Sequence, residues 1–153
     1  MNRRTVFTTG GVGTVLGIIG CLDDGDSENS TTSTDNWTPT LTVPEVTLEQ
    51  GGDTTVTLEA TDVAGVHVSA VPHTTAITVA YDSSDASPSP DRIVDTLPLH
   101  LYWDSREDVV VDVHIDASED VDPGEYQFAV TVFDQDGENR EDSTEESRIT
   151  IVE

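Results

Sequence analysis

From residue 41 to the end of the chain, apolar and polar residues alternate with a period of two. Val109, Val111 and Val113, for example, alternate with Asp112 and His114. Successive side chains of an extended chain point to opposite faces, so this pattern is typical of β-strands with one buried face. Gly, Pro, Asp and Ser, which favour turns, separate the short apolar runs. The sequence therefore predicts an all-β domain over residues 41–153, without a helix.

The most regular strand follows a turn at Pro123-Gly124. Its apolar residues recur at every second position and share one face: Tyr126, Phe128, Val130 and Val132. Eight or so short strands over about 110 residues are typical of two packed antiparallel sheets. We therefore expect an antiparallel β-sandwich of about seven to nine strands.

The turn, Gly124, Tyr126 and the alternating strand resemble the penultimate strand of the immunoglobulin-like modules of secreted and cell-surface proteins. The resemblance covers residues 41–153 and implies that Tyr126 is a corner tyrosine, whose hydroxyl bonds the backbone upstream. An ordinary core tyrosine is the alternative. The disulfide of that family cannot form within this chain, because Cys21 is the only cysteine. Apolar packing must then stabilise the domain, which its size allows.

The first twenty residues are typical of an export signal. Arg3 and Arg4 precede a Gly-rich apolar segment, residues 8–20, which is too short for a bilayer core that requires about 20 residues. We therefore predict that residues 1–20 are a processed signal peptide. The arginine pair resembles a twin-arginine signal. Val6 stands where that motif prefers Phe, so general secretory export remains the alternative.

Cys21 ends this segment in the sequence Ile18-Ile19-Gly20-Cys21, which resembles a lipobox. The resemblance implies that Cys21 is lipidated and becomes the first residue of the mature chain. Membrane lipid is then a partner, and two acyl chains would be needed for stable attachment. We expect the protein at the cell membrane, lipid-anchored and facing the extracellular side.

Residues 21–40 are acidic, rich in Ser and Thr, and almost free of aliphatic residues. Such a composition is typical of a flexible tether. Two sequons, at Asn29 and Asn36, are candidate N-glycosylation sites. We expect the aromatic residue beside the second sequon, Trp37, to cap the edge of the domain.

The charge of the mature chain is extreme. After Cys21 there are four arginines, no lysine and 31 acidic residues, which leaves a net charge of −27. Self-repulsion at this charge opposes compaction unless salt screens it, and the screening length falls from about 10 Å at 0.1 M to about 3 Å at 1 M. Together with the arginine pair and the lipobox, this composition resembles that of haloarchaeal-type surface lipoproteins. An acidic disordered chain is the rival interpretation, and the strand pattern argues against it.

Such a surface makes nucleic acid a poor partner, whereas cations and basic proteins suit it better. Two sets of residues are candidate metal ligands: His114 with its strand neighbours Asp112 and Asp116, and the loop residues Asp134, Asp136 and Asn139. The loop meets half of the EF-hand pattern, so calcium is the one cofactor considered. A solvated strand face and a hairpin turn are the alternatives. A blue-copper site lacks its ligands, because the only Cys is the anchor and the only Met is Met1.

No catalytic motif is present. No Ser lies in a Gly-x-Ser-x-Gly elbow, and Tyr102 and Trp103, being adjacent on a strand, would leave at most one ring exposed to stack on a sugar. We therefore predict a lipid-anchored, extracytoplasmic, non-catalytic interaction or structural module at the surface of a halophile, with other surface proteins as partners. The alternative is a cation-dependent ligand-binding or carrier lipoprotein that uses the acidic loop or the His114 face.

Overall fold

The computed structural model describes residues 36–135 and 140–153. The chain divides into two units, Met1–Thr34 and Asp35–Glu153, and the described residues all belong to the second. Six of the predicted site residues lie outside the described residues: Arg3, Arg4, Cys21, Asn29, Asp136 and Asn139. Within the described part there is no α-helix, and hence none of the length and apolarity needed to cross a membrane.

Nine strands, β1 to β9, and one short 3-10 turn, η1 (Ser83–Asp85), make up the described chain. The predicted all-β fold class is confirmed, although the sheet is mixed rather than purely antiparallel. All strand pairs are antiparallel except β2 with β9, which run parallel. The strands are β1 (Thr40–Thr42), β2 (Val46–Glu49), β3 (Asp53–Ala70), β4 (Ile77–Ala80), β5 (Ala86–Ser87), β6 (Arg92–Val94), β7 (His100–Ala117), β8 (Gly124–Phe133) and β9 (Asp142–Val152).

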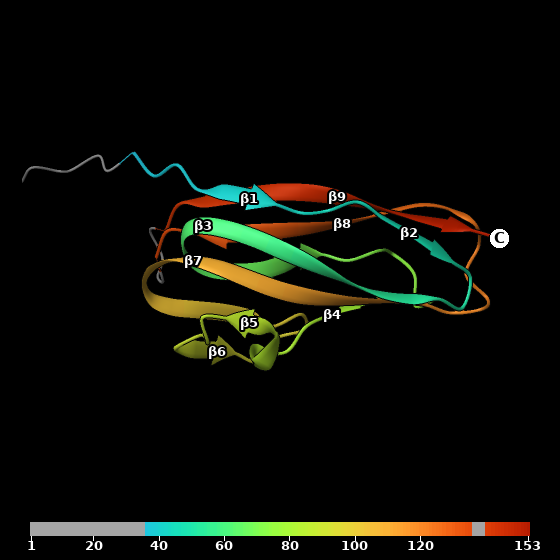
Figure 1. The fold of residues 1–153 in the computed structure, drawn as a ribbon, viewed down its shortest axis with the longest axis horizontal. Helices are drawn as coiled ribbons and strands as arrows, with labels where there is room; N and C mark the ends of the chain where they lie inside the picture. Colours follow the sequence, from blue (N-terminus) through green and yellow to red (C-terminus); the bar gives the residue numbers. More distant parts are fainter. Residues whose placement is uncertain (1–35, 136–139) are drawn as a thin grey trace, which may run out of the picture. The chain divides into compact units, whose positions relative to one another are not determined.

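Two long strands, β3 and β7, belong to both layers of the sandwich. Each has 18 residues and turns back on itself at the left-hand end of Figure 1. The first half of β3 pairs with β1 and with the second half of β7, which also pairs with β4 and β5. The second half of β3 pairs with β8 and with the first residues of β7, and β9, β2 and β6 complete that layer.

Asp62 marks the point at which β3 leaves one layer for the other. The register with β7 shifts between Ala60 and Val63, and Asp62 adopts a positive φ of 58°, a conformation that Asp tolerates better than most residues. The Trp37 indole donates to the Asp62 carbonyl at 2.7 Å, and its half-buried ring packs against the core. The sequence shows the alternation on both sides of this bend but not that one strand continues through it.

The core lies between the two layers and is almost entirely aliphatic. Val109, Val111, Val113 and Ile115 are at most 2% exposed, as their alternation predicts. Near the start of β8, the Tyr126 hydroxyl donates to the carbonyl of Asp122, four residues upstream, at 2.8 Å. The described chain has no buried side-chain polar atom without a hydrogen-bond partner. The largest fully buried side chains are Phe128, Leu58, Leu101, Ile115, Ile149, Val63, Val66, Val68, Val109, Val111, Val113 and Val121.

Candidate functional site: an aromatic face flanked by arginines

The outer face of one layer carries rings instead of the usual small polar residues. In the strand register, Gly65 of β3 lies between Tyr102 of β7 and Phe133 of β8. Two residues further along β3, His67 lies beside His100 of β7. These side chains alternate with inward-facing residues, so they lie on the outer side of the layer. We call His67, His100, Tyr102 and Phe133 the ring face.

Glycine at position 65 makes this arrangement fit. A Cβ atom there would lie 2.9 Å from the Phe133 ring and 3.0 Å from the Tyr102 ring, closer than carbon atoms approach one another. Because Gly65 has no Cβ atom, the Phe133 and Tyr102 rings cover the β3 backbone from both sides, with centroids 6.2 Å apart. A glycine inside a strand often marks such a close approach. Here it allows two large rings to share one row of the sheet.

Two arginines cover the rings. The Arg140 guanidinium lies 3.9 Å above the centre of the Phe133 ring, and the Arg92 guanidinium lies 4.5 Å from the centre of the Tyr102 ring. Both distances are within the range of cation–π attraction. Tyr102 and Phe133 are each only 4% exposed although they lie on the outer face. The guanidinium groups, rather than the rings, are therefore what a partner would meet.

A hydrogen-bond chain connects Arg140 to the histidines. Arg140 Nη1 donates to the Tyr102 hydroxyl at 2.9 Å, and that hydroxyl lies 3.2 Å from His100 Nδ1. Because a guanidinium can only donate, the tyrosine proton is available for His100 Nδ1. The neighbouring ring, His67, places Nδ1 at 3.3 Å from the Leu99 carbonyl, to which it donates. An imidazole that accepts at Nδ1, as His100 does in this arrangement, is neutral.

The surroundings of the two histidines favour the neutral form. Burial lowers the pKa of His67, and the Arg140 charge adds to this effect, while the hydrogen bond to Leu99 opposes it. Burial also lowers the pKa of His100, with further contributions from His67 and Arg140. Desolvation and a nearby positive charge both penalise an imidazolium. Both imidazoles therefore favour the neutral form more strongly than a solvated imidazole does.

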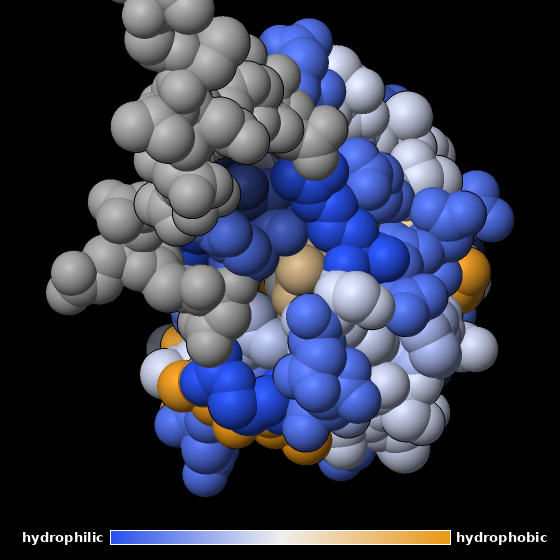
Figure 2. All heavy atoms as spheres, turned by 90° about the vertical axis from the view of Figure 1, so that its left-hand side faces the viewer, coloured by the Kyte–Doolittle hydropathy of each residue, from blue (hydrophilic) through white to orange (hydrophobic). Residues whose placement is uncertain are grey.

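A groove of about 390 Å³ adjoins the ring face where β7 turns back. Arg92 and Arg106 line it together with Tyr102, and Arg106 pairs with Asp62 at 3.6 Å. Viewed onto the end where β3 and β7 turn back, the surface is mostly hydrophilic, with apolar residues toward its margins (Figure 2). The remaining groove residues are Ala64, Trp103, Asp104, Ser105, Asp134 and Gln135.

Of the four arginines that follow Cys21, Arg92 and Arg140 contact Tyr102, and Arg106 lines the groove beside it. Guanidinium groups offer paired donors that match carboxylate and sulfate oxygens. No sequence pattern indicated this cluster, because the arginines lie far apart in the chain and belong to no motif. The overall acidity indicates cations or basic proteins as partners, whereas this face has the chemistry to bind anions.

The adjacent aromatic residues Tyr102 and Trp103 do not present a free ring. Trp103 is 4% exposed, and its indole donates to the Pro88 carbonyl at 3.1 Å. Tyr102 is equally buried in the ring face. The alternation of sides is as expected, but both sides of β7 are covered at this point.

His114 lies on an open strand face, with partners that the sequence did not indicate. Its Nδ1 is 3.0 Å from the Thr55 hydroxyl, and its Nε2 is 3.3 Å from Asp85. Asp112, one of the predicted co-ligands, instead accepts a hydrogen bond from Thr57 at 2.7 Å. No group of three or more His, Cys, Asp or Glu residues with metal-binding geometry occurs in residues 36–135 and 140–153.

Asp134 closes the β8–β9 hairpin. Its carboxylate accepts the Glu141 amide at 2.7 Å, and its own amide donates to the Glu141 carbonyl at 3.2 Å. This pair accounts for an acidic residue at that position without a metal ion. Asn36, the sequon asparagine within the described chain, is exposed.

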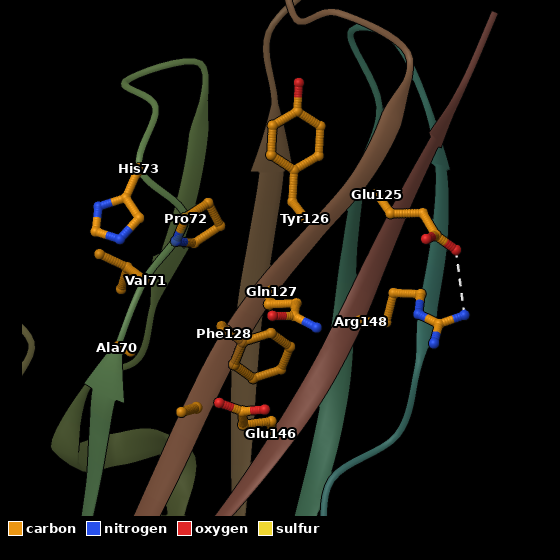
Figure 3. A pocket seen from close by; sticks show the side chains of 11 residues that line it. Ala70, Val71, Pro72, His73, Glu125, Tyr126, Gln127, Phe128, Glu146 and Arg148 are labelled. Carbon is orange, nitrogen blue, oxygen red and sulfur yellow. Dashed lines mark hydrogen bonds and ion pairs between the residues drawn. The ribbon is translucent and has the colours of Figure 1, made fainter.

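A larger groove, of about 550 Å³, lies where β3 ends (Figure 3). Val71, Pro72 and His73 form one side, and residues of β8 and β9 form the other. Glu125 and Arg148 pair there at 3.1 Å, both largely exposed. An exposed pair of this kind contributes little binding or folding energy. The groove brings together fewer cationic groups than the ring face, which is therefore the better candidate site.

Comparison with known proteins does not identify a family. No family model matches the chain, and no curated protein matches it. Among solved structures, the chain is similar to AggA, the major subunit of aggregative adherence fimbriae type I from Escherichia coli, at 15% identity and a TM-score of 0.38, covering 75% of this chain and 93% of AggA. It is also similar to a family 123 glycoside hydrolase from Clostridium perfringens, at 11% identity and a TM-score of 0.39, covering 70% of this chain and 23% of the hydrolase. Likenesses this distant do not bear on function.

Proposed function

We propose that the chain is a lipid-anchored, extracytoplasmic, non-catalytic interaction module at the surface of a halophile, and that its ring face binds a carboxylate-bearing surface partner. The observation that supports this proposal is the contact of Arg92 and Arg140 with Tyr102, with Arg106 lining the adjoining groove, on a domain that is otherwise acidic. The lipid anchor and the outward orientation rest on the arginine pair and on Cys21 in the sequence.

An anionic partner should bind where the arginines gather, because the rest of the surface is acidic. A mature chain with a net charge of −27 repels anions over most of its surface. Multimolar salt screens charges beyond a few ångströms, so long-range attraction contributes little there. Paired guanidinium hydrogen bonds act at contact distance, and their geometry persists in salt. The arginines beside the ring face are therefore placed where short-range recognition of carboxylates can work.

Binding, rather than turnover, is the activity that we infer from the geometry. The imidazoles of His67 and His100 stack on each other, and their Nδ1 atoms already contact Leu99 and Tyr102. The Thr55–His114–Asp85 chain lies on an open strand, where the His114 side chain is 55% exposed. A hydroxyl activated for attack needs a site that excludes water and stabilises an oxyanion. The exposed face around His114 offers no such enclosure.

The proposal is tested by crosslinking in native membranes. The full-length protein would be expressed in a halophilic host and crosslinked in multimolar salt, and the captured surface proteins compared between variants. We expect the triple variant Arg92→Gln, Arg106→Gln, Arg140→Gln to lose its crosslinks. Arg148→Gln, which removes the arginine outside the cluster, is the matched control and should keep them. Equal capture by both variants would contradict a role for the ring face.

A further inference from the structure

The edge strand β4 lies in an uncharged stretch of an otherwise acidic chain. Residues 63–81 contain no Asp, Glu, Lys or Arg, although the chain has 31 acidic residues. β4 ends the strand order, with β7 as its neighbour on one side. Natural sheet edges are usually protected by charged side chains, proline or a covering segment. Ile77–Ala80 has no charged residue of its own to discourage pairing.

The hydrogen-bond pattern shows which backbone groups face outward. Ser118 donates to the Ala76 carbonyl at 2.8 Å, so Ala76 and every second residue after it face β7. Ala117, which lies opposite Ile77, donates instead to Gly52 on its other side at 2.9 Å. Ile77 and Val79 therefore direct their backbone N–H and C=O groups away from β7.

An apolar groove of about 470 Å³ runs beside this edge. Of its lining residues, Leu97 is 98% exposed and Val71 is 40% exposed. None of the groove residues is charged: Val71, Pro72, Thr74, Thr75, Ile77, Thr78, Val79, Ala80, Tyr81, Leu97, Pro98 and Leu99. A protruding leucine and a neighbouring apolar groove on one face are typical of an interaction surface.

We propose that this face binds a second copy of the chain, through antiparallel pairing of β4 with its counterpart across a two-fold axis. Two copies, each of charge −27 after Cys21, repel one another wherever acidic surfaces meet, so an uncharged face is the region where they can approach. A two-fold contact uses the same patch twice, which suits a face that carries both a protrusion and a groove. The outward groups of Ile77 bond those of Val79 in the other copy.

This pairing fixes one position on the axis. With Ile77 and Val79 forming the hydrogen-bonded pairs, Thr78 lies opposite Thr78 of the other copy as a non-hydrogen-bonded pair. Residues in such a pair have Cα atoms about 4.5 Å apart. That separation lies within the range that a disulfide spans. Thr78 is exposed, so its replacement leaves the core intact.

Disulfide trapping tests the pairing directly. In the full chain carrying Cys21→Ser, Thr78→Cys should form crosslinked dimers under mild oxidation in multimolar salt. Thr47→Cys, at an exposed position of the other edge strand β2, is the matched control and should remain monomeric. Equal crosslinking at both positions, or none at Thr78→Cys, would overturn the proposal.

Sedimentation equilibrium in multimolar potassium chloride gives a second measurement. The parent chain should dimerise, and Leu97→Asp should weaken the dimer at least about tenfold, equivalent to about 1.4 kcal/mol. Val152→Asp, which changes an exposed valine far along the sequence, should leave the dissociation constant unchanged. The triple arginine variant should also dimerise normally, which separates this surface from the ring face. A parent chain that is monomeric at every soluble concentration would refute the dimer.

Discussion

His67 and His100 lie face to face across strands β3 and β7, with ring centroids 3.5 Å apart and planes inclined by 25°. The contact is compatible with neutral imidazoles, since a charged ring would face its neighbour and Arg140 without a balancing carboxylate in the hydrogen-bond chain. The stack continues through His100 to Tyr102 and Phe133. The ring face is thus one packed unit that supports the arginines.

This stack predicts a loss of stability in mild acid. The folded pKa values of His67 and His100 lie below the unfolded value of about 6.5, so the unfolded chain binds protons first as the pH falls. The stabilisation is complete above about pH 6.5 and decreases as the pH falls toward the folded pKa values. Denaturant melts at about pH 7.5 and about pH 5 in constant multimolar salt would measure it.

Comparing how the free energy of unfolding changes with pH in different variants isolates the contribution of His67 and His100. The double variant His67→Asn, His100→Asn should lose less stability than the parent between the two pH values. His73→Asn, which changes an exposed histidine outside the ring face, should keep the parent slope. Identical slopes in the parent and the double variant would show that the stack does not titrate with folding.

Gly65→Ala should destabilise the domain by about 1–3 kcal/mol, the usual cost of overpacking. The new methyl group would lie within about 3 Å of the Phe133 and Tyr102 rings, on backbone that cannot move freely. Thermal and denaturant unfolding measure the loss. Adding Phe133→Leu should recover part of it, because the nearest ring atom is removed. Strictly additive effects of the two changes would mean that the rings do not press on position 65.

The period-two pattern was sufficient to predict the layered β-fold and the inward residues of β7, because burial on one face directly imposes that alternation. It could not reveal that β3 runs through both layers. That continuity depends on Asp62 adopting a positive φ while Trp37 and Asp108 hold its backbone. The alternation on either side of the bend would be the same whether β3 were one strand or two.

The ring face could not be predicted for a different reason. Arg92 reaches Tyr102 because β6 pairs with the start of β7, and Arg140 reaches it across β8 and β3. Each step depends on strand register between distant segments, which one sequence does not specify. The composition pointed to cationic partners because it averages over the surface, whereas recognition depends on where the few arginines gather.

The hydroxyl groups of Tyr81 and Tyr126 should contribute differently to the free energy of unfolding. The buried Tyr81 hydroxyl accepts from the Val68 amide at 3.2 Å and donates to the Leu99 carbonyl, and burial raises its pKa to about 12. Tyr81→Phe leaves both backbone groups unpaired and should cost about 1–3 kcal/mol. Tyr126→Phe removes one bond to the exposed Asp122 carbonyl and should cost about 0.5–1 kcal/mol.

Denaturant unfolding of both variants at neutral pH measures this difference. Equal losses would mean that water replaces the hydroxyl at position 81 as readily as at position 126. A near-zero loss for Tyr126→Phe would show that its hydrogen bond does not contribute to the corner between Asp122 and β8.

If Cys21 carries the lipid anchor, a single substitution there should move the protein from the membrane fraction to the soluble fraction. The parent protein should sediment with membranes, and mass spectrometry should find Cys21 at the start of the mature chain with acyl chains attached. Cys21→Ser removes the thiol that carries them, so the protein should move to the soluble fraction or medium. Arg3→Lys with Arg4→Lys tests the export route and should block export only if the twin-arginine route is used. An unmodified full-length chain in the cytosol would contradict the anchor.

Salt dilution should unfold the domain, because its charges are nearly all of one sign. Lowering the salt below about 0.5 M lengthens the screening distance, and acidic side chains on neighbouring strands then repel one another. Within β9 alone, Asp142, Glu145 and Glu146 lie exposed close together. Circular dichroism should show loss of β-structure as potassium chloride is diluted, and replacing these three residues with Asn and Gln should move the midpoint to lower salt. A spectrum unchanged at about 0.1 M would show that apolar packing alone overcomes the repulsion.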